Sequence, residues 1–323
     1  MLTAIVLLNY NGLQLLQQFL PKVVQHSPQA KIYVADNAST DQSREWVATQ
    51  YPEVQWVALD KNYGYAQGYN LALQQVSEPL YCLMNTDIET TKHWLNPIEE
   101  LFQKHPNIGI AQPKILDFKK KTHFEYAGAA GGYIDQLGFP YCRGRVFDTL
   151  EKDEQQYKTE KIFWASGACF FIRKSVFEQL GGFDDDFFAH QEEIDLCWRA
   201  FNENIDAYCC AESTVYHVGG ATLHKSSPKK TYLNFRNSLY MLYKNLPLKG
   251  RFSTIFKRLC YDGIAGVRMI LQGKPRHCFA VVFSHFAYYA HIPKLKRKRT
   301  SSQYRTDYFQ IKDIVKEYFL KRK

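Results

Sequence analysis

Apolar and polar positions alternate in two recurring patterns along the first 117 residues. Short apolar, β-prone runs occupy residues 3–9, 31–36, 54–60, 79–85 and 108–116. Longer stretches with apolar residues at helical spacing lie between them, at residues 12–26, 40–50, 66–76 and 93–105. Strands that alternate with helices of this length predict an α/β fold, with a mainly parallel central sheet flanked by helices.

Several of the predicted strands end in polar clusters. The first ends in "NYNG" around Asn9, the second in "DNASTD" from Asp36, and the fourth in "NTD", residues 85–87. Each cluster alone fits a turn or a helix start, with Ser39 or Thr40 as the cap of the helix after Asp36. Three clusters at one edge of a sheet predict a ligand crevice. The first strand is not followed by GxGxxG, which weighs against a dinucleotide-binding dehydrogenase.

The middle of the chain, residues 118–160, is rich in glycine and aromatic residues and has little helical period. We expect loops and a hairpin here, lying over the mouth of the crevice. Two basic residues in this region, Arg143 and Arg145, allow two interpretations. They contact a phosphate or an acidic acceptor, or they are simply exposed.

A later segment, "FFAHQEEIDLCWRAF", places Glu192, Glu193 and Asp195 in the first turn of a predicted helix. Acids at a helix N-terminus stabilise the helix dipole, by under about 1 kcal/mol each. That effect accounts for one of the three residues. Three acids within four positions indicate a further role.

The charge is divided unevenly along the chain, which carries a net +9. Residues 224–323 contain 23 Lys and Arg against 4 Asp and Glu, so the remainder is acidic. Basic segments bind phosphates, either of nucleic acid or of an anionic membrane. The eight cysteines form no CxxC pair and lie mostly within apolar runs, as buried thiols in a reducing compartment do. Because the N-terminus resembles a strand rather than a signal peptide, we expect a cytoplasmic protein.

Taken in order, the motifs resemble those of the family 2 glycosyltransferases of the GT-A fold, in the branch of the bacterial rhamnosyltransferases. The motifs are "NYNG", "DNASTD", "NYGYAQGYNLAL", "NTD" and "FFAHQEEIDLCWR". The resemblance covers roughly residues 1–245 and implies a GT-A catalytic domain there, whose nucleotide-binding half is Rossmann-like. Residues 246–323, which we call the tail, form a basic, helical C-terminal extension.

The resemblance assigns roles to individual residues. Asp36 matches the acid that hydrogen-bonds the nucleotide base. "NTD" matches the DxD-type metal motif, with Asp87 as its last carboxylate and Asn85 in place of the first. His217 fits the position of a further metal ligand, with a structural strand-end histidine as the alternative. The remaining residues expected to bind the nucleotide sugar are Asn9, Asn11, Asn62, Gly64, Asn85, Thr86 and Arg236.

The acidic helix start matches the family's "ED-x-D" stretch, whose second acid is the general base. This places the base at Glu193, with Glu192 as the alternative, and leaves Asp195 to brace the helix. Glu193 departs from the family's Asp by one methylene. Arg236 lies in "YLNFRNSLYMLYKNLP", where processive relatives carry QxxRW. Two roles are open for it: contact with the diphosphate, or membership of a helix that only packs on the protein.

The resemblance implies an inverting, non-processive transfer of one sugar in the synthesis of cell-surface polysaccharide, and it favours rhamnose as that sugar. The donor is a dTDP- or UDP-linked sugar, the acceptor a saccharide or a lipid-linked saccharide, and the cofactor a divalent ion, Mn²⁺ or Mg²⁺. A nucleotidyltransferase and a non-catalytic sugar-nucleotide-binding protein are the alternatives. The first normally has a basic, Gly-rich phosphate loop, which "LLNYNG" lacks, and the acids at 192–193 argue against the second.

The tail interleaves aromatic and basic residues. Its longest apolar run, residues 278–292, is shorter than the roughly 20 residues that a membrane-spanning helix needs. Helices with an aromatic face and a basic rim lie in the membrane interface. We therefore expect the tail to dock on an anionic membrane at its cytoplasmic face, with packing on the catalytic domain as the alternative. No nucleic-acid recognition fold accompanies the charge.

Overall fold

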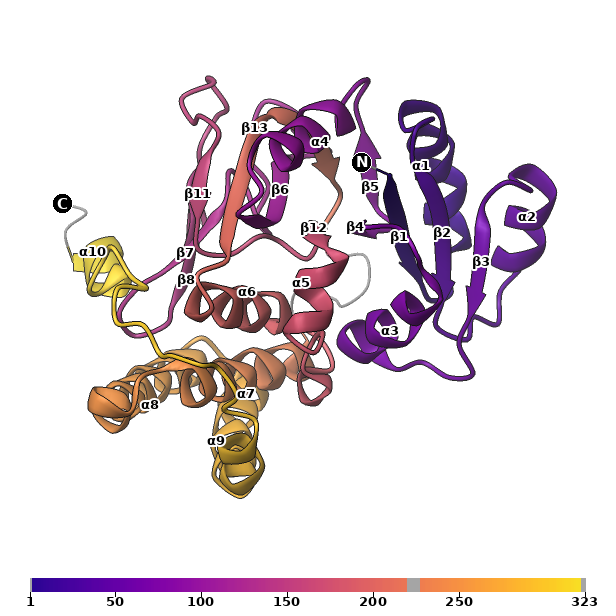
Figure 1. Cartoon of the computed structure of the whole chain (residues 1–323). Helices are drawn as coiled ribbons and strands as arrows, with labels where there is room; N and C mark the ends of the chain where they lie inside the picture. Colours follow the sequence, from indigo (N-terminus) through magenta and orange to yellow (C-terminus); the bar gives the residue numbers. More distant parts are fainter. Residues whose placement is uncertain (1, 220–226, 321–323) are drawn as a thin grey trace.

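A nine-stranded central sheet organises the chain, and the computed structural model describes residues 2–219 and 227–320 of it (Figure 1). Its order is β11-β13-β6-β12-β4-β1-β2-β3, with β5 paired to β13. The strands are β1 (Thr3–Asn9), β2 (Lys31–Asp36), β3 (Gln55–Ala58), β4 (Leu80–Asn85), β5 (Ile88–Thr90), β6 (Ile108–Asp117), β11 (Glu160–Ile162), β12 (Cys169–Arg173) and β13 (Asp206–His217).

The sheet contains two groups of parallel strands and several antiparallel pairs. β4, β1, β2 and β3 run parallel, and so do β6 and β13. β12 lies between these two groups and is antiparallel to both β4 and β6. The α/β class is confirmed, but the sheet is mixed, because β12 joins its two parallel halves.

Helices cover both faces of the sheet, as the alternation of side chains along β1 requires. Ile5 and Leu7 point into the core beneath α1, α2 and α4, whereas Ala4 and Val6 point into the core beneath α3 and α6. The helices of this part are α1 (Leu13–His26), α2 (Ser43–Gln50), α3 (Gly64–Ala72), α4 (Leu95–Lys104), α5 (Lys174–Gln179) and α6 (Glu192–Asn202).

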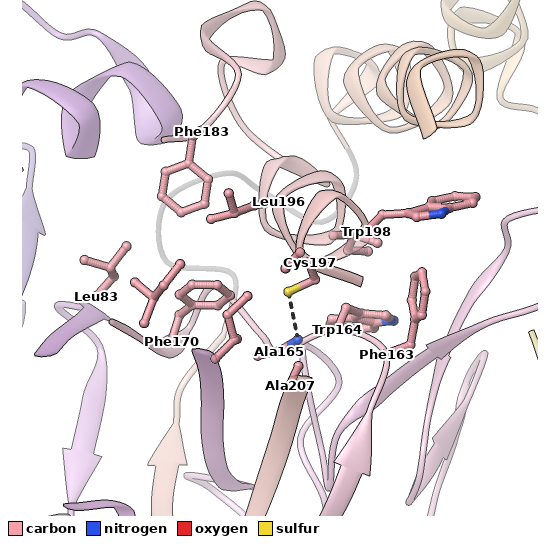
Figure 2. Close-up of a cluster of buried hydrophobic side chains, with 14 of the residues drawn as sticks. Leu83, Phe163, Trp164, Ala165, Phe170, Phe183, Leu196, Cys197, Trp198 and Ala207 are labelled. Atoms are coloured by element: carbon pink, nitrogen blue, oxygen red, sulfur yellow. Dashed lines mark hydrogen bonds between the residues drawn. The ribbon is translucent and has the colours of Figure 1, made fainter. Parts of the chain in front are cut away.

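The helix that begins with the acidic residues, α6, is fixed to the sheet by large buried side chains (Figure 2). Leu196 and Trp198 lie in this core, and the Trp198 ring meets that of Phe163 edge to face at 5.6 Å. The Ala165 N–H donates to Cys197 Sγ at 3.5 Å. The first turn of α6 therefore has a rigid support.

Residues 118–160 contain more regular structure than the expected loops and hairpin. A small antiparallel sheet forms from β7 (Gly132–Ile134), β8 (Pro140–Cys142), β9 (Arg145–Val146) and β10 (Thr149–Leu150). Arg143 pairs with Glu160 at 2.6 Å, and Arg145 is buried with its guanidinium over the Tyr126 ring. The interpretation that these two arginines are exposed is wrong.

The chain continues in four helices, three of which lie together beyond α6 (Figure 1). They are α7 (Pro228–Asn245), α8 (Leu248–Leu271), α9 (Pro275–Arg297) and α10 (Ile314–Leu320). Tail residues Ile255, Tyr288 and Leu295 belong to the same buried core as α6. The tail thus packs in part on the catalytic part, and a division at residue 245 stays a prediction.

All eight cysteines are free thiols, and six of them are buried, as the sequence indicated. In the described part of the chain, no helix combines the length and the apolar character needed to cross a bilayer.

Candidate active site

Three strand-end clusters meet at one edge of the sheet, in the positions that the sequence predicted. Asn9 of β1 lies opposite Asp36 of β2, and Leu8 lies opposite Asn85 of β4. The side chain of Asn9 donates from Nδ2 to Asp36 Oδ1 at 3.0 Å. Equal register brings these polar groups together because parallel strands end at the same edge.

The loop after Asp36 is held by hydrogen bonds to the loop after β1. Ser39 N–H donates to Asp36 Oδ2 at 2.9 Å, and Asn11 N–H donates to Ser39 Oγ at 2.8 Å. Asn11 Oδ1 accepts from Thr40 N–H at 2.7 Å. Asn9, Asn11 and Asp36 thus share one network at the predicted nucleotide pocket.

The expected capping of α2 by Ser39 or Thr40 is wrong, since the helix begins only at Ser43. Asp41 occupies the place near the helix start instead. It accepts from Ser43 N–H at 3.1 Å and from Leu13 N–H, at the start of α1, at 3.0 Å. One carboxylate therefore joins the N-termini of both helices, where the helix dipoles favour negative charge.

Asp87 and His217 meet because β5, which follows Asp87 directly, pairs with the end of β13. His217 Nε2 lies 3.2 Å from Asp87 Oδ1, and His217 Nδ1 lies 3.2 Å from Glu125 Oε2. All three side chains are buried. The imidazole thus stands between two carboxylates in the interior of the protein.

This arrangement shifts the pKa values of the residues involved. Burial lowers the pKa of His217, but contact with Asp87 and Glu125 outweighs burial and raises that pKa to about 10. Burial raises the pKa of Asp87, whereas contact with His217 reverses the shift and holds the pKa below its usual range. Without a metal ion, the group is a charged His–carboxylate cluster at neutral pH.

The same atoms fit a divalent ion. A carboxylate oxygen and an imidazole nitrogen are ligand types that suit Mn²⁺ and are compatible with Mg²⁺. Metal-binding histidines usually turn their other ring nitrogen to a carboxylate, as His217 turns Nδ1 to Glu125. If an ion binds here, Asp87 Oδ1 and His217 Nε2, 3.2 Å apart, would hold it, and Glu125 would lie behind the ring at Nδ1.

A second acidic cluster, Asp184–Asp186, does not compete for this role. Its carboxylates pair with lysines of α7, of α9 and of the residue just after α9. Lys244 of α7 lies 2.6 Å from Asp184, and Lys298, just after α9, lies 2.7 Å from Asp186. These contacts hold the pKa of Asp184 well below its usual range, against the effect of burial. The cluster fastens α9 to the loop before α6.

The structure brings Glu193 to the same sheet edge through the start of β12. Asn85 N–H donates to the Ala168 carbonyl at 3.0 Å, so the "NTD" turn lies against the chain just before β12. The preceding residue, Gly167, faces the Glu193 carboxyl group: a Cβ on Gly167 would lie 3.7 Å from Glu193 Cδ. Tyr65 of α3 also reaches this point and donates its hydroxyl to the Gly167 carbonyl at 2.8 Å.

Glu192 and Glu193 differ in protonation. Burial raises the pKa of Glu193 to about 7, although backbone N–H groups of α6 and Gly167 oppose the shift. Burial, and next the charge of Glu193, raise the pKa of Glu192 well above its usual range. The upward shift favours the neutral form of Glu192, whereas the pKa of Glu193 lies near neutral pH, in the range suited to a general base. Asp195 is fully buried among Arg199, Lys244 and Asn245, which fits the bracing role expected of it.

The loop that leads into α6 has an unfavourable backbone conformation. Phe188, His190 and Gln191 have φ values of 61°, 72° and 69°, in the left-handed region that non-glycine residues rarely adopt. Such conformations persist when neighbouring contacts hold them. This loop sets the position of Glu192 and Glu193 directly after it.

Helix α7 supplies those contacts. Asn237 Nδ2 lies within hydrogen-bonding distance of the Phe187, Ala189 and His190 carbonyls, at 3.0, 2.9 and 2.7 Å. Arg236 donates to the Asp186 carbonyl at 2.8 Å. The guanidinium of Arg236 therefore supports the loop in this structure, and contact with a diphosphate stays a prediction.

Gly64 is explained by packing against the same loop. A Cβ there would lie 2.6 Å from the Phe188 carbonyl oxygen, and Gly64 has a φ of +75°. The Gly64 N–H donates to Oδ1 of the exposed residue Asn62 at 2.9 Å. Nucleotide-sugar binding by Asn62, Gly64 and Thr86 stays a prediction.

Several buried polar atoms of β1 and of the start of α6 have no hydrogen-bond partner in the described chain. They include Asn9 Oδ1, His190 Nε2, Gln191 Oε1, Glu192 Oε2 and Glu193 Oε2. A buried polar atom left unpaired costs about 1–3 kcal/mol, so a concentration of them indicates a place that a polar ligand or water completes.

Sequence reasoning missed three residues of this site: Glu125, Tyr65 and Asn237. Glu125 lies in the Gly-rich middle region, and only the fold brings it to His217. Tyr65 lies in the recognised motif "NYGYAQGYNLAL", which offered a signal for it. Asn237 follows Arg236 directly in "YLNFRNSLYMLYKNLP", and only tertiary structure brings it to the loop before α6.

Comparisons with known proteins agree with the family suggested by the motifs. The profile of the family described as "Glycosyl transferase family 2" matches residues 4–181, more than half of the chain. The low-salt glycan biosynthesis hexosyltransferase Agl10 of Haloferax volcanii is 25% identical over 295 residues, which are 87% of this chain and 88% of Agl10.

Two further comparisons extend this result. The N-acetylglucosaminyl-diphospho-decaprenol L-rhamnosyltransferase of Mycobacterium tuberculosis is 25% identical over 211 residues, 59% of this chain and 67% of the relative. The structure of GalNAc-T7 with UDP, GalNAc and Mn²⁺ superimposes with a TM-score of 0.61 at 17% identity, over 75% of this chain and 48% of that one. The structural likeness shows a common fold.

We predict that Asn237→Ala destabilises the protein by about 1–3 kcal/mol, because it removes the side-chain donor to the part-buried Ala189 and His190 carbonyls of the strained loop. Denaturant unfolding measures the change. Asn234→Ala is the matched control on the same helix, since among the described residues its side chain bonds only to the Lys230 carbonyl one turn away. We expect the control to change the free energy of unfolding by less than about 0.5 kcal/mol. Equal effects of the two substitutions would contradict the role given to Asn237.

Proposed function

The chain belongs to glycosyl transferase family 2 and has the GT-A fold, and from this premise we propose that it is an inverting, non-processive glycosyltransferase. Its relatives include a hexosyltransferase and a rhamnosyltransferase, so it is an enzyme of class 2.4. The proposed donor is a dTDP- or UDP-linked sugar, with rhamnose as the leading candidate. The proposed acceptor is a saccharide, free or lipid-linked, in cell-surface polysaccharide synthesis.

The observation that supports this proposal is that Glu193 and the "NTD" turn, which ends in Asp87, both lie against the chain just before β12. Gly167 faces Glu193, and the next residue, Ala168, accepts from Asn85 in the "NTD" turn. Sugar transfer needs a base for the acceptor hydroxyl and a positive environment for the leaving diphosphate. The two requirements meet at one sheet edge.

In the proposed reaction, Glu193 takes the proton of an acceptor hydroxyl. The hydroxyl oxygen forms a bond to the anomeric carbon from the face opposite the diphosphate, and the bond from that carbon to the diphosphate oxygen breaks. The nucleoside diphosphate leaves and the configuration at carbon is inverted. A positioned base contributes typically about 10²–10⁴-fold, and substrate positioning supplies much of the rest.

A divalent ion held by Asp87 and His217 would neutralise charge on the leaving diphosphate. In support, the structurally similar GalNAc-T7 was determined with UDP and Mn²⁺. Asp36, with Asn9 and Asn11 beside it, is proposed to bind the base of the nucleotide.

We further propose that the tail holds the enzyme on an anionic membrane at the cytoplasmic face. Exposed apolar residues follow helical spacing on α8 and on α9: Phe252 and Phe256 on the first, Phe279, Phe283 and Phe286 on the second. Phe252 is 84% exposed and Phe286 is 67% exposed. Apolar helix faces with basic neighbours favour the membrane interface.

The base is tested by substitution at the two acids. Glu193→Gln should lower turnover by at least about 10²-fold and leave donor binding nearly unchanged. Glu192→Gln should lower turnover by less than about tenfold, because the raised pKa of Glu192 favours its neutral form, which glutamine resembles. Steady-state transfer assays and donor titration measure the two effects.

The pH profile provides the control for this test. Because Glu193 must be ionised to accept a proton, kcat/KM should fall as the pH drops below about 7, by about tenfold per pH unit. Glu193→Asp keeps a carboxylate and should keep such a limb, whereas Glu193→Gln should lose it. A large loss in Glu192→Gln instead would move the base by one residue, and no loss in either would reduce the acids to a helix start.

Membrane docking is tested with the full chain, since part of the tail belongs to the core. The double variant Phe252→Ser/Phe256→Ser should bind vesicles of phosphatidylglycerol and phosphatidylcholine at least about tenfold more weakly in sedimentation. Binding of the unaltered protein should also fall in high salt. Leu2→Ser/Leu150→Ser, which removes exposed apolar residues elsewhere, is the control and should bind normally. Equal binding to purely neutral vesicles would contradict the proposal.

A further inference from the structure

A groove lies where the first turns of α7 and α9 meet. Its volume is about 550 Å³, within the range of roughly 300–1,000 Å³ of small-molecule sites. The residues that line it are Pro228, Lys229, Tyr232, Arg276, Phe279, Ala280 and Phe283. Aromatic rings and hydrocarbon form most of the lining, and Lys229 and Arg276 are the charged residues among the described residues that line it.

The two helices that form the groove are joined beside it. Thr231 Oγ1 of α7 lies 2.7 Å from His277 Nδ1 of α9. Both residues are direct neighbours, in the sequence, of residues that line the groove. Lys229 and Arg276 are both exposed, and in the described part of the chain neither forms an ion pair. The groove is thus an open, largely apolar depression whose lining includes the positive charges of Lys229 and Arg276.

The groove adjoins the loop that positions the catalytic acids. Lys229 Nζ lies 5.2 Å from the centre of the Phe188 ring. The Phe188 carbonyl accepts from Tyr65 N–H at 2.8 Å, and Tyr65 reaches Gly167 beside Glu193. In the other direction, Phe279 and Phe283 belong to the exposed apolar face of α9, each with 62% of its surface exposed. The groove therefore links the site of chemistry to the face proposed to meet the membrane.

We propose that this groove binds the lipid portion of a lipid diphosphate-linked acceptor, an inference that rests on the proposed function. The isoprenoid chain lies along Tyr232, Phe279 and Phe283, and the diphosphate is held by Lys229 and Arg276. Guanidinium and ammonium groups are the side chains that bind phosphate oxygens most strongly. The chain continues from the groove along the apolar face of α9, and the saccharide extends past Phe188 toward Glu193.

The test uses farnesyl diphosphate as a soluble isoprenoid diphosphate, titrated calorimetrically into the full-length protein. Lys229→Glu/Arg276→Glu should weaken its binding by at least about tenfold, because two attractions become repulsions. Lys257→Glu changes an exposed basic residue elsewhere on the tail and should alter the affinity by less than about twofold. UDP or dTDP affinity with Mn²⁺ should be the same in all three proteins, which also shows that each variant folds.

Several outcomes would overturn the groove as the acceptor site. One is competition between the nucleotide and farnesyl diphosphate, which would place the diphosphate at the donor site. Another is equal affinity for inorganic pyrophosphate, or an equal loss in Lys257→Glu. A third is that the double variant loses binding only to phosphatidylglycerol vesicles, which would make the groove a contact for lipid headgroups. Failure of the proposed function would appear differently, as an absence of nucleotide binding or of sugar transfer in the unaltered protein with farnesyl diphosphate binding intact.

Discussion

The arrangement of the site depends on one buried histidine between two carboxylates. Asp87 and Glu125 are both removed from water, and buried carboxylates are costly unless they are paired. His217 pairs with both, from opposite ends of one ring. The pairing requires β13 to reach the strand ends and β5 to fold back beside it. The topology of this half of the sheet is therefore what brings His217 and Asp87 together.

The second half of the site is the loop before α6, and helix α7 holds it in place. The loop before α6 adopts three left-handed residues in four positions, and Asn237 holds its carbonyls. α7 in turn is packed against α9, which is tied to the same loop through Asp184 and Asp186. The helices proposed to contact the membrane are therefore mechanically connected to the residues proposed to activate the acceptor. This connection gives a physical reason for the tail and the catalytic part to form one core.

The sequence was sufficient for the parts that follow from local pattern. Short continuous apolar runs located β1, β2 and β4, and parallel register then placed Asn9, Asp36 and Asn85 at one edge. The acids of α6 were evident from their density in one turn. By contrast, Glu125 lies in an irregular region, and only tertiary structure shows that it faces His217. Ser39 failed as a helix cap because Asp36 and Asn11 use its hydrogen bonds.

The central claim is that the donor diphosphate and its metal ion lie beside Asp87 and His217. Pulsed electron paramagnetic resonance of Mn²⁺ bound together with UDP or dTDP tests this claim most directly. The account predicts a nitrogen coupling from the His217 imidazole that appears with the nucleotide and disappears in His217→Gln. Nucleotide-dependent Mn²⁺ binding with no nitrogen coupling, or with the same coupling in His217→Gln, would contradict it.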